Sequence, residues 1–288
     1  MIKKGIILAG GKGSRMGPIT KATNKQLLPI HDKPLFFYSL SILMLAKIKD
    51  ILIIVNQDQL EQFKKILPNG NNLGIKISYS IQKEPKGLPD AFIIGEKFIG
   101  KSNIALILGD NFFFGQSLTE KLINLTKINK GAKILIHPVK DPGNYGVAKI
   151  GKNKKIIEII EKPKKPKSNM AISGLYFFDN KVVNFSKKLK KSKRNELEII
   201  DLLKKYKQIN QLRYENLGRG ATWLDAGSIQ DLQTVSNFVS TIETRQGFKI
   251  GCLEEIAFKN KWIGKKEIKK SINFYGKCEY SNYLTNFL

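Results

Sequence analysis

Cysteine and histidine are scarce in this chain of 288 residues, which has two of each: Cys252 and Cys278, His31 and His137. The cysteines form no CxxC pair, so neither a disulfide framework nor a thiolate zinc site is expected. The two isolated histidines do not suit a zinc site or a Ser-His-Asp relay. We therefore expect structural roles for both histidines and a reducing, cytoplasmic environment.

Long apolar runs are also missing. No run approaches the ~20 residues that a membrane-spanning helix needs. The N-terminal residues Met1-Ile2-Lys3-Lys4 lead into a short apolar segment without the pattern of a signal peptide. We expect neither membrane insertion nor secretion.

Acidic residues are few, since 24 Asp and Glu stand against 50 Lys and Arg and give a formal net charge of +26. Such a charge could attract nucleic acid. Arginine, however, occurs only five times, leaving 50 − 5 = 45 lysines, and the arginine fork is the group that phosphate and base recognition favour. The lysine runs contain few aromatic residues to stack on bases. The composition therefore disfavours nucleic acid as a partner.

The hydrophobic periodicity predicts an α/β protein in which strands and helices alternate. In the first part of the chain, strands are expected over 3–9, 51–55, 75–80 and 104–108, with helices over 34–47 and 88–99. After a helix over 118–127 the chain becomes strand-rich, with strands expected over 132–139, 146–150, 156–160 and 171–178. This second region is typical of an insertion that carries another binding surface.

The remaining residues are predicted to be mainly helical. The pattern indicates a helix over 196–207, a strand over 212–217, a turn over 223–227, a helix over 229–244 and a further helix from 254 onward. The fold class expected from the whole pattern is a Rossmann-like, mixed, mostly parallel sheet flanked by helices, with a strand-rich insertion and C-terminal helices.

The first strand is followed by a glycine-rich loop, Gly10-Gly11-Lys12-Gly13-Ser14-Arg15-Met16-Gly17. Missing Cβ atoms allow backbone N–H groups to approach phosphates closely. The loop lacks the Rossmann GxGxxG, because Met16 stands where the third glycine would fall, and it lacks the Walker A order. A tight turn is the alternative interpretation, but four glycines with Arg15 and the later Lys25 favour phosphate binding.

A carboxylate follows the apolar strand over 104–108. Asp110 would lie at the carboxyl end of that strand, where ligands bind in open α/β sheets, and it could hold Mg²⁺. A helix cap is the alternative for Asp110, and turn chemistry is the alternative for Asn111 beside it.

Beyond the loop, the sequence resembles the sugar-phosphate nucleotidyltransferases. Lys25-Gln26-Leu27-Leu28-Pro29 is similar to the bacterial glucose-1-phosphate thymidylyltransferases, the first enzymes of dTDP-rhamnose synthesis, whereas glucose-1-phosphate uridylyltransferases typically carry Lys-Glu at that point. The resemblance continues almost to the C-terminus through Phe36-Phe-Tyr38, Gly87-Leu88, Leu108-Gly-Asp110-Asn111, Tyr145-Gly146-Val147, Glu161-Lys162-Pro163-Lys164, Glu196-Leu-Glu-Ile199, Trp223-Leu-Asp225 and Glu254-Glu-Ile-Ala257.

The resemblance implies an Mg²⁺-dependent enzyme that joins dTTP to glucose 1-phosphate and releases pyrophosphate. It implies catalytic roles for Arg15, Lys25 and Lys162, and a metal site at Asp110 and Asp225. The nucleotide-binding residues it implies are Gly10, Gly11, Gly13, Ser14, Gln26, Gln82, Gly87 and Asp110. The sugar-phosphate-binding residues it implies are Leu88, Tyr145, Gly146, Glu161, Lys162, Ile172, Arg194 and Trp223.

The resemblance also suggests how the chain is organised. We expect a single domain over 1–288, with a nucleotide-binding half over 1–110, a sugar-phosphate-binding half over 111–227 and a C-terminal helical interface or regulatory segment over 228–288. Members of the family are usually homotetramers with a regulatory nucleotide at a subunit interface. This sequence departs from the family pattern around that site, at Phe114, Gln116, Thr119 and Lys259, and elsewhere at Gly17, His31 and Ile200. Feedback inhibition is therefore a weaker expectation than catalysis.

Two alternatives remain open at this point. One is a nucleotidyltransferase that uses UTP or another triphosphate, or another sugar such as N-acetylglucosamine 1-phosphate, because a few pocket residues can change the substrate of a fold. The other is a non-catalytic, basic binding or regulatory relative. Loss of Asp110, Asp225 or Arg15 would favour the second, but all three are present.

Overall fold

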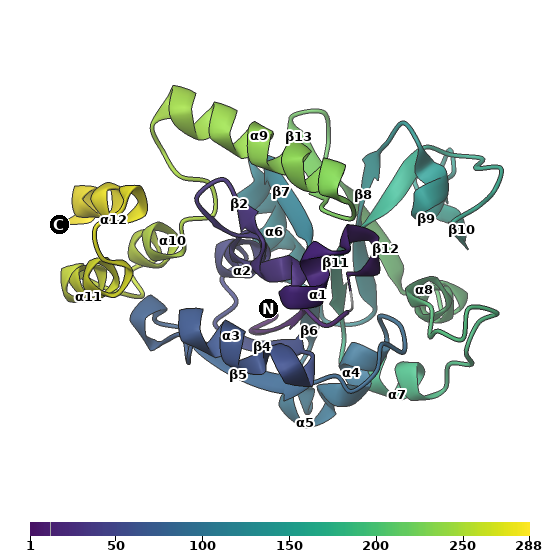
Figure 1. Ribbon diagram of the computed structural model, residues 1–288. Helices are drawn as coiled ribbons and strands as arrows, with labels where there is room; N and C mark the ends of the chain where they lie inside the picture. The colour runs from purple at the N-terminus through teal and green to yellow at the C-terminus, as the bar shows by residue number, and fades with distance from the viewer. Residues whose placement is uncertain (12) are drawn as a thin grey trace.

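A mixed sheet forms the centre of the protein (Figure 1). The computed structural model describes residues 1–11 and 13–288. The sheet has nine strands in the order β10-β9-β11-β6-β1-β4-β5, with β8 pairing β11 and β12 pairing β8. Their bounds are β1 Lys4–Leu8, β4 Asp50–Val55, β5 Lys76–Ile81, β6 Ile104–Leu108, β8 Ala132–Pro138, β9 Gly146–Ile150, β10 Ile156–Glu161, β11 Met170–Phe178 and β12 Leu212–Asn216.

The two halves of the sheet differ in strand direction. Strand β1 runs parallel to β4 and β6, and β4 runs parallel to β5. Strand β11 runs antiparallel to β6, β8 and β9. The strand-rich region predicted as an insertion therefore continues the N-terminal sheet across β6 and β11. The α/β class and the mixed, Rossmann-like sheet are confirmed.

Helices cover both faces of this sheet because successive strand residues point to opposite sides. Ile7 and Ile53 pack into the cluster that contains α2, α6 and α10, whereas Ile6 and Leu52 pack into the cluster that contains α4, α7 and α8. The helix bounds are α1 Ile19–Ala22, α2 Leu35–Leu45, α3 Leu60–Ile66, α4 Asp90–Ile94, α5 Glu96–Ile99, α6 Leu118–Thr126, α7 Val182–Lys187, α8 Ile199–Gln208, α9 Ile229–Gln246, α10 Leu253–Lys259, α11 Lys265–Tyr275 and α12 Glu279–Leu284.

Two short two-stranded sheets complete the fold: β2 (Pro29–Ile30) with β3 (Lys33–Pro34), and β7 (Asn111–Gly115) with β13 (Ala221–Asp225). The turn predicted over 223–227 is wrong for its first half, because pairing with β7 draws those residues into a strand. Neither β7 nor α3 was expected from the periodicity. The helix predicted over 88–99 is two helices that meet at Gly95.

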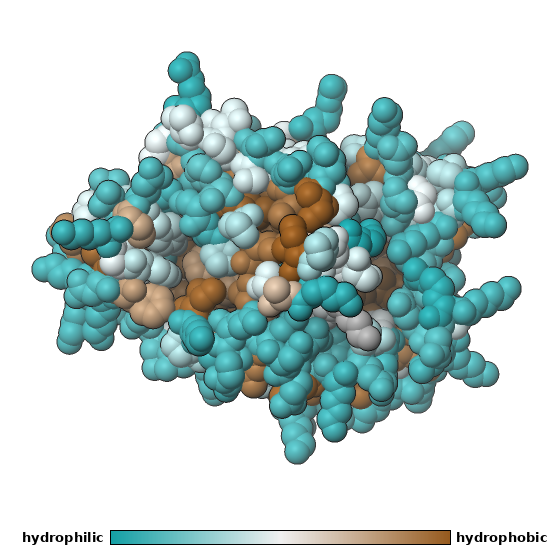
Figure 2. All heavy atoms as spheres, in the orientation of Figure 1, coloured by the Kyte–Doolittle hydropathy of each residue, from teal (hydrophilic) through white to brown (hydrophobic). Residues whose placement is uncertain are grey.

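The C-terminal helices lie at one end of the molecule, where α10 packs against α2 (Figure 1). Hydrophilic residues cover most of the face in Figure 2, and hydrophobic residues gather toward its middle. Among the described residues, no helix is long and apolar enough to span a membrane.

Candidate active site

The glycine-rich loop leaves the carboxyl end of β1 and is held against the neighbouring strands. A Cβ atom on Gly10 would lie only 2.7 Å from Gln82 Oε1, so a larger residue at position 10 would displace the Gln82 side chain at the end of β5. Asn56, directly after β4, forms two hydrogen bonds with Gly11. The Gly11 N–H donates to Asn56 Oδ1 at 3.3 Å, and Asn56 Nδ2 donates to the Gly11 carbonyl at 3.2 Å. Sequence reasoning missed Asn56, although it follows a buried strand at the same sheet edge as Asp110.

The loop closes over a cavity of about 260 Å³. The predicted phosphate contacts of the loop and Asp110, the first predicted metal ligand, line it, together with Gly227, which follows β13. Lys12, one of the two cations of the loop, lies outside the described residues. The structure therefore brings together the following predicted residues around one hollow: Gly10, Gly11, Gly13, Ser14, Arg15, Lys25, Gln26 and Asp110.

Two carboxylates from distant parts of the chain meet beside this cavity. Asp110 follows β6, and the register of β7 with β13 places Asp225 opposite Asn111. Arg15 lies at the same place, since a Cβ on Gly227 would be 3.2 Å from Asp225 Oδ2 and 3.3 Å from Arg15 Nη2. The sheet pairing thus brings together two acids that are separated by 225 − 110 = 115 residues in the sequence.

The electrostatics of this pair suit a divalent cation. Burial raises the pKa of Asp225, and the charge of Asp110 raises it further, while a hydrogen bond from Tyr145 opposes the shift. A cation between two carboxylates would relieve their repulsion, and Mg²⁺ is commonly held by one or two carboxylates together with substrate phosphates. Lys25 Nζ is ion-paired with Asp110 Oδ2. Among the described residues, no cluster of three or more His, Cys, Asp or Glu side chains offers a protein-only metal cage.

Asn111 links Asp110 by hydrogen bonds to two neighbouring strands of the cleft. The sequence did not reveal this role. Its Nδ2 donates to Asp110 Oδ1 at 2.9 Å. Its Oδ1 accepts hydrogen bonds from the Gly174 N–H on β11 at 3.0 Å and from Trp223 Nε1 on β13 at 2.7 Å. Buried polar groups that are fully hydrogen-bonded rigidify their surroundings. The orientation of the Asp110 carboxylate is therefore fixed by three separate strands.

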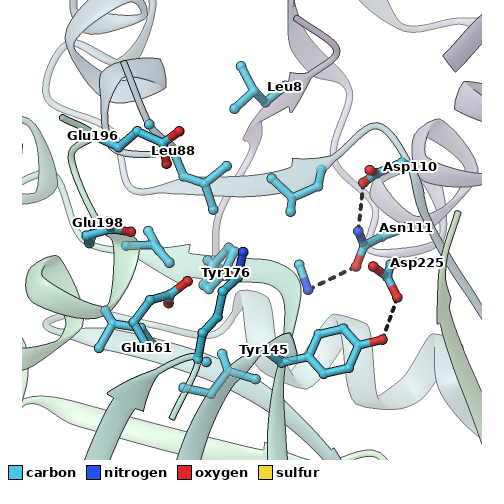
Figure 3. A pocket seen from close by; sticks show the side chains of 18 of the residues that line it. Leu8, Leu88, Asp110, Asn111, Tyr145, Glu161, Tyr176, Glu196, Glu198 and Asp225 are labelled. Atoms are coloured by element: carbon cyan, nitrogen blue, oxygen red, sulfur yellow. Dashed lines mark hydrogen bonds between the residues drawn. The ribbon is translucent and has the colours of Figure 1, made fainter. Parts of the chain in front are cut away.

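The sugar-phosphate residues implied by the resemblance line a second, adjoining cavity of about 360 Å³. It shares Gly10, Arg15, Leu88 and Asp110 with the first. Figure 3 shows Asp110, Asn111 and Asp225 on one side of this cavity and Glu161, Glu196 and Glu198 on the other. All the predicted residues of this group lie in its wall: Leu88, Tyr145, Gly146, Glu161, Lys162, Ile172, Arg194 and Trp223.

Tyr145 connects the two sides of the cavity. Its hydroxyl donates to Asp225 Oδ1 at 2.8 Å, its ring meets Trp223 edge-to-face with ring centroids 5.1 Å apart, and its carbonyl accepts a hydrogen bond from the Lys162 N–H at 3.0 Å. Lys162 has a φ of 41°, a left-handed conformation that is uncommon for a residue with a side chain and is often found at functional sites.

The far side of the cavity carries an ionic network that was only partly expected. Arg194 Nη2 contacts Glu161 Oε1 at 3.3 Å and Glu198 Oε2 at 2.7 Å. Burial raises the pKa of Glu161, as does the charge of Glu198, while Lys162 and Arg194 lower it. The pKa of Glu198 is instead lowered, because hydrogen bonds from Arg194 and Ser192 outweigh its burial. Glu198 was not among the predicted site residues.

The backbone of Gly87 packs against that network. Gly87 has a φ of 100°, and a Cβ there would lie 2.1 Å from the Leu197 carbonyl oxygen. Leu197 N–H donates to the Lys86 carbonyl at 2.7 Å. This contact holds the chain extended before α8, so the helix begins at Ile199 rather than at 196 as predicted. Contact with Leu197 alone accounts for the glycine at 87, independently of the nucleotide-binding role that the resemblance implies.

The two histidines lie outside both cavity walls. His137 lies on β8, where burial lowers the pKa of its imidazole. His31 lies between β2 and β3, and its N–H donates to Ser236 Oγ at 3.0 Å. Neither histidine lines the cleft.

The sequence matches the family model for nucleotidyl transferases over residues 4–242. The chain belongs to this family. It is 46% identical over 285 residues to a glucose-1-phosphate thymidylyltransferase of Neisseria meningitidis, covering 99% of each chain. It is 43% identical to one of Mycolicibacterium smegmatis, again covering 99% of each chain. The resemblance noted from the sequence motifs is confirmed.

Solved structures lead to the same family. A structure assigned as a glucose-1-phosphate thymidylyltransferase of Bacillus anthracis, in complex with a sucrose, matches with a TM-score of 0.76 and 40% identity over 82% of this chain and 94% of that one. A UDP-glucose pyrophosphorylase complexed with UDP-glucose matches with a TM-score of 0.72 and 27% identity, covering 84% of this chain and 99% of that one.

Proposed function

We propose that this nucleotidyltransferase joins dTTP and α-D-glucose 1-phosphate to form dTDP-α-D-glucose and pyrophosphate. The observation that carries the proposal is one cleft in which the glycine-rich loop, the Asp110–Asp225 pair and the basic residues Lys162 and Arg194 meet. The identity with the Neisseria and Mycolicibacterium relatives, over nearly the whole chain, supports the same substrates.

In the proposed reaction, an oxygen of the sugar phosphate bonds to the α-phosphorus of dTTP. The bond from that phosphorus to the β-phosphate oxygen breaks, and the electron pair leaves with pyrophosphate. The nucleophile is already anionic, so the barrier lies in bringing negative groups together and in stabilising the spreading charge. No protein nucleophile or general base is required.

The residues of the two cavities have different roles in this reaction. Arg15 and Lys25, beside the glycine loop, would neutralise the leaving pyrophosphate, and Lys162 would steer the sugar phosphate. Glu161 would accept hydrogen bonds from sugar hydroxyls. Asp110 and Asp225 would hold Mg²⁺, which would polarise the α-phosphate.

Two glutamines are suited to choosing the nucleotide. Gln26 Oε1 is buried beside the first cavity and has no hydrogen-bond partner among the described residues, so it can accept from a bound ligand. Gln82 Nε2 donates a hydrogen bond to Asp90 Oδ2 at 3.0 Å. The side-chain oxygen of Gln82 therefore lies beside Gly10 in the second cavity. We assign both to the nucleotide, with Gln82 at the thymine edge.

Use of UTP or another triphosphate is the competing proposal, which the match to a UDP-glucose pyrophosphorylase keeps open. The test is pyrophosphate release with glucose 1-phosphate and Mg²⁺ across dTTP, UTP, CTP, GTP and ATP. We expect the highest kcat/KM with dTTP. A preference for UTP would overturn the nucleotide assignment, and no release with any of them would support the non-catalytic alternative.

The family resemblance also supports proposals about assembly and pathway. We propose a homotetramer, or a dimer, with a regulatory nucleotide site at a subunit interface, in the first step of a dTDP-rhamnose type of deoxysugar synthesis. Phe114, a departure from the family at that site, packs against Phe238 and Phe248 with ring centroids 5.6 and 6.4 Å away. A cytoplasmic location stays a prediction.

A further inference from the structure

The segment before α8 forms the outer wall of the larger cavity, and one buried carboxylate organises it. Glu198 is 8% exposed. Its Oε1 accepts hydrogen bonds from Arg194 Nε at 3.1 Å and from Ser192 Oγ at 2.6 Å, and its Oε2 accepts from Arg194 Nη2 at 2.7 Å. Arg194 thus binds Glu198 with two edge nitrogens of its planar fork, the arrangement that fixes a guanidinium most rigidly.

The backbone of the same segment is anchored partly by other backbone groups and partly by Ser192, whose Oγ accepts a hydrogen bond from the Arg194 N–H at 3.1 Å. Leu197 N–H donates to the Lys86 carbonyl, and Ser192 N–H donates to the Glu196 carbonyl at 2.8 Å. The anchor holds Glu198 in place, whereas the Arg194 side chain is 44% exposed. Only side-chain contacts therefore restrict where the guanidinium points, and the two strongest come from Glu198.

The geometry leaves one edge of the Arg194 fork for a ligand. Nε and Nη2 contact Glu198, and Nη2 has a longer contact of 3.3 Å with Glu161. Among the residues that the structure describes, Nη1 makes no hydrogen bond to any side chain or backbone group. Arg194 lines the cavity with Lys162 and Tyr145, so Nη1 and Lys162 can bind one phosphate together.

We propose that Glu198 is a positioning residue that holds Arg194 in the orientation needed to bind the phosphate of the sugar substrate. This inference rests on the proposed function. Glu198 lines the cavity, but the role proposed for it is exerted through Arg194 and not through a contact with the substrate. Without the carboxylate, the long Arg194 side chain regains rotamer freedom, and its remaining contacts, with Glu161 at 3.3 Å and Glu196 at 4.0 Å, compete with the phosphate for it.

The test compares Glu198→Gln with the wild type in steady-state assays of both substrates. Loss of a charge-assisted, two-point contact should raise KM for glucose 1-phosphate about 10-fold. It should leave KM for dTTP unchanged and change kcat by less than about 3-fold, because the nucleotide end keeps its contacts. The matched control is Glu96→Gln, which removes a surface ion pair with Lys187 (2.6 Å) outside both cavities.

A double-mutant cycle shows whether Glu198 acts through Arg194. In an Arg194→Ala background, Glu198→Gln should have no further effect on KM for glucose 1-phosphate. A full 10-fold effect in that background, or none in the wild-type background, would overturn the proposal. Ser192→Ala, which removes the hydroxyl that donates to Glu198 and accepts from the Arg194 N–H, is a milder variant and should raise the same KM about 3-fold. If Glu198→Gln fails to fold, Glu198→Asp, which draws the carboxylate back from the guanidinium, takes its place, and an unchanged KM for glucose 1-phosphate in that variant would overturn the proposal.

The assays distinguish failure of the proposed function from failure of the proposed role of Glu198. A wild-type enzyme that makes no nucleotide sugar from glucose 1-phosphate would sink the proposed function and this inference together. A wild type that is active on glucose 1-phosphate, with both variants unchanged in KM, would sink only the role of Glu198.

Discussion

The two sides of the cleft are built in different ways. At the acid side, Asp110 and Asp225 come from the ends of paired strands, and Asn111 and Tyr145 hydrogen-bond to them. At the opposite side, Arg194 is half exposed, lies in a loop and is oriented by ion pairs with Glu161 and Glu198. Sheet pairing fixes positions more firmly than exposed ion pairs do. Changes at the acid side should therefore lower kcat, and changes at the loop side should weaken sugar-phosphate binding.

The largest effect is expected from removing a charge at the acid side. Asp110→Asn or Asp225→Asn should lower kcat at least ~10²-fold, the scale of one lost electrostatic contact in a transition state. The thermal melting temperature should stay near that of the wild type, because the amide preserves size and, for Asp110→Asn, the relief of repulsion between the two acids offsets the lost ion pair with Lys25. The matched control is Asp201→Asn, which removes a surface ion pair with Lys204 outside the cleft. Near-normal turnover in either acid-side variant would sink the metal assignment.

A smaller effect is expected where the two sides are joined. Tyr145→Phe removes the hydroxyl that donates to Asp225 and keeps the ring on Trp223. Because a hydrogen bond to a charged group contributes at least about 1.5 kcal/mol, kcat should fall at least about 10-fold.

Tyr79→Phe provides the control for Tyr145→Phe. It removes a comparable hydroxyl, bonded to the Leu67 carbonyl, away from both cavity walls, and it should leave kcat unchanged. If Tyr145→Phe affects only KM for glucose 1-phosphate, the division between the two sides is wrong.

Parts of this contrast could be predicted from the sequence. Asp110 follows a run of apolar residues, and such a run indicates a strand whose carboxyl end carries ligands. The sequence could not show that Ala221–Asp225 is a strand, because five residues before a glycine-flanked turn have too little periodicity. The family motifs supplied Asp225 instead.

The loop side was harder to predict for a different reason. Glu198 contacts Arg194 four residues before it, yet what makes this geometry possible is the contact of Leu197 with Lys86 and Gly87. A contact across about 110 residues leaves no periodic pattern in a single sequence. Asn56 is an intermediate case, since it follows a predicted strand but belongs to no motif.

The smallest expected effect is a change in pH dependence at the loop side. Burial and the charge of Glu198 raise the pKa of Glu161. Removing a nearby negative charge makes the carboxylate form easier to reach, so Glu198→Gln should lower this pKa. The acidic limb of the pH profile of kcat/KM for glucose 1-phosphate should then move to lower pH. The titrations of the substrates are common to both enzymes, so only the shift between the profiles is diagnostic, and a shift to higher pH would contradict the account.

The most direct test of nucleotidyl transfer is to identify the product. Wild-type protein and Asp225→Asn are each incubated with dTTP and glucose 1-phosphate, with Mg²⁺ and with a chelator, and the mixtures are analysed by mass spectrometry. We expect dTDP-glucose and pyrophosphate in equal amounts from the wild type with Mg²⁺, and little or none from the other three mixtures. Absence of dTDP-glucose from the wild type with Mg²⁺, or equal yields from Asp225→Asn, would contradict it.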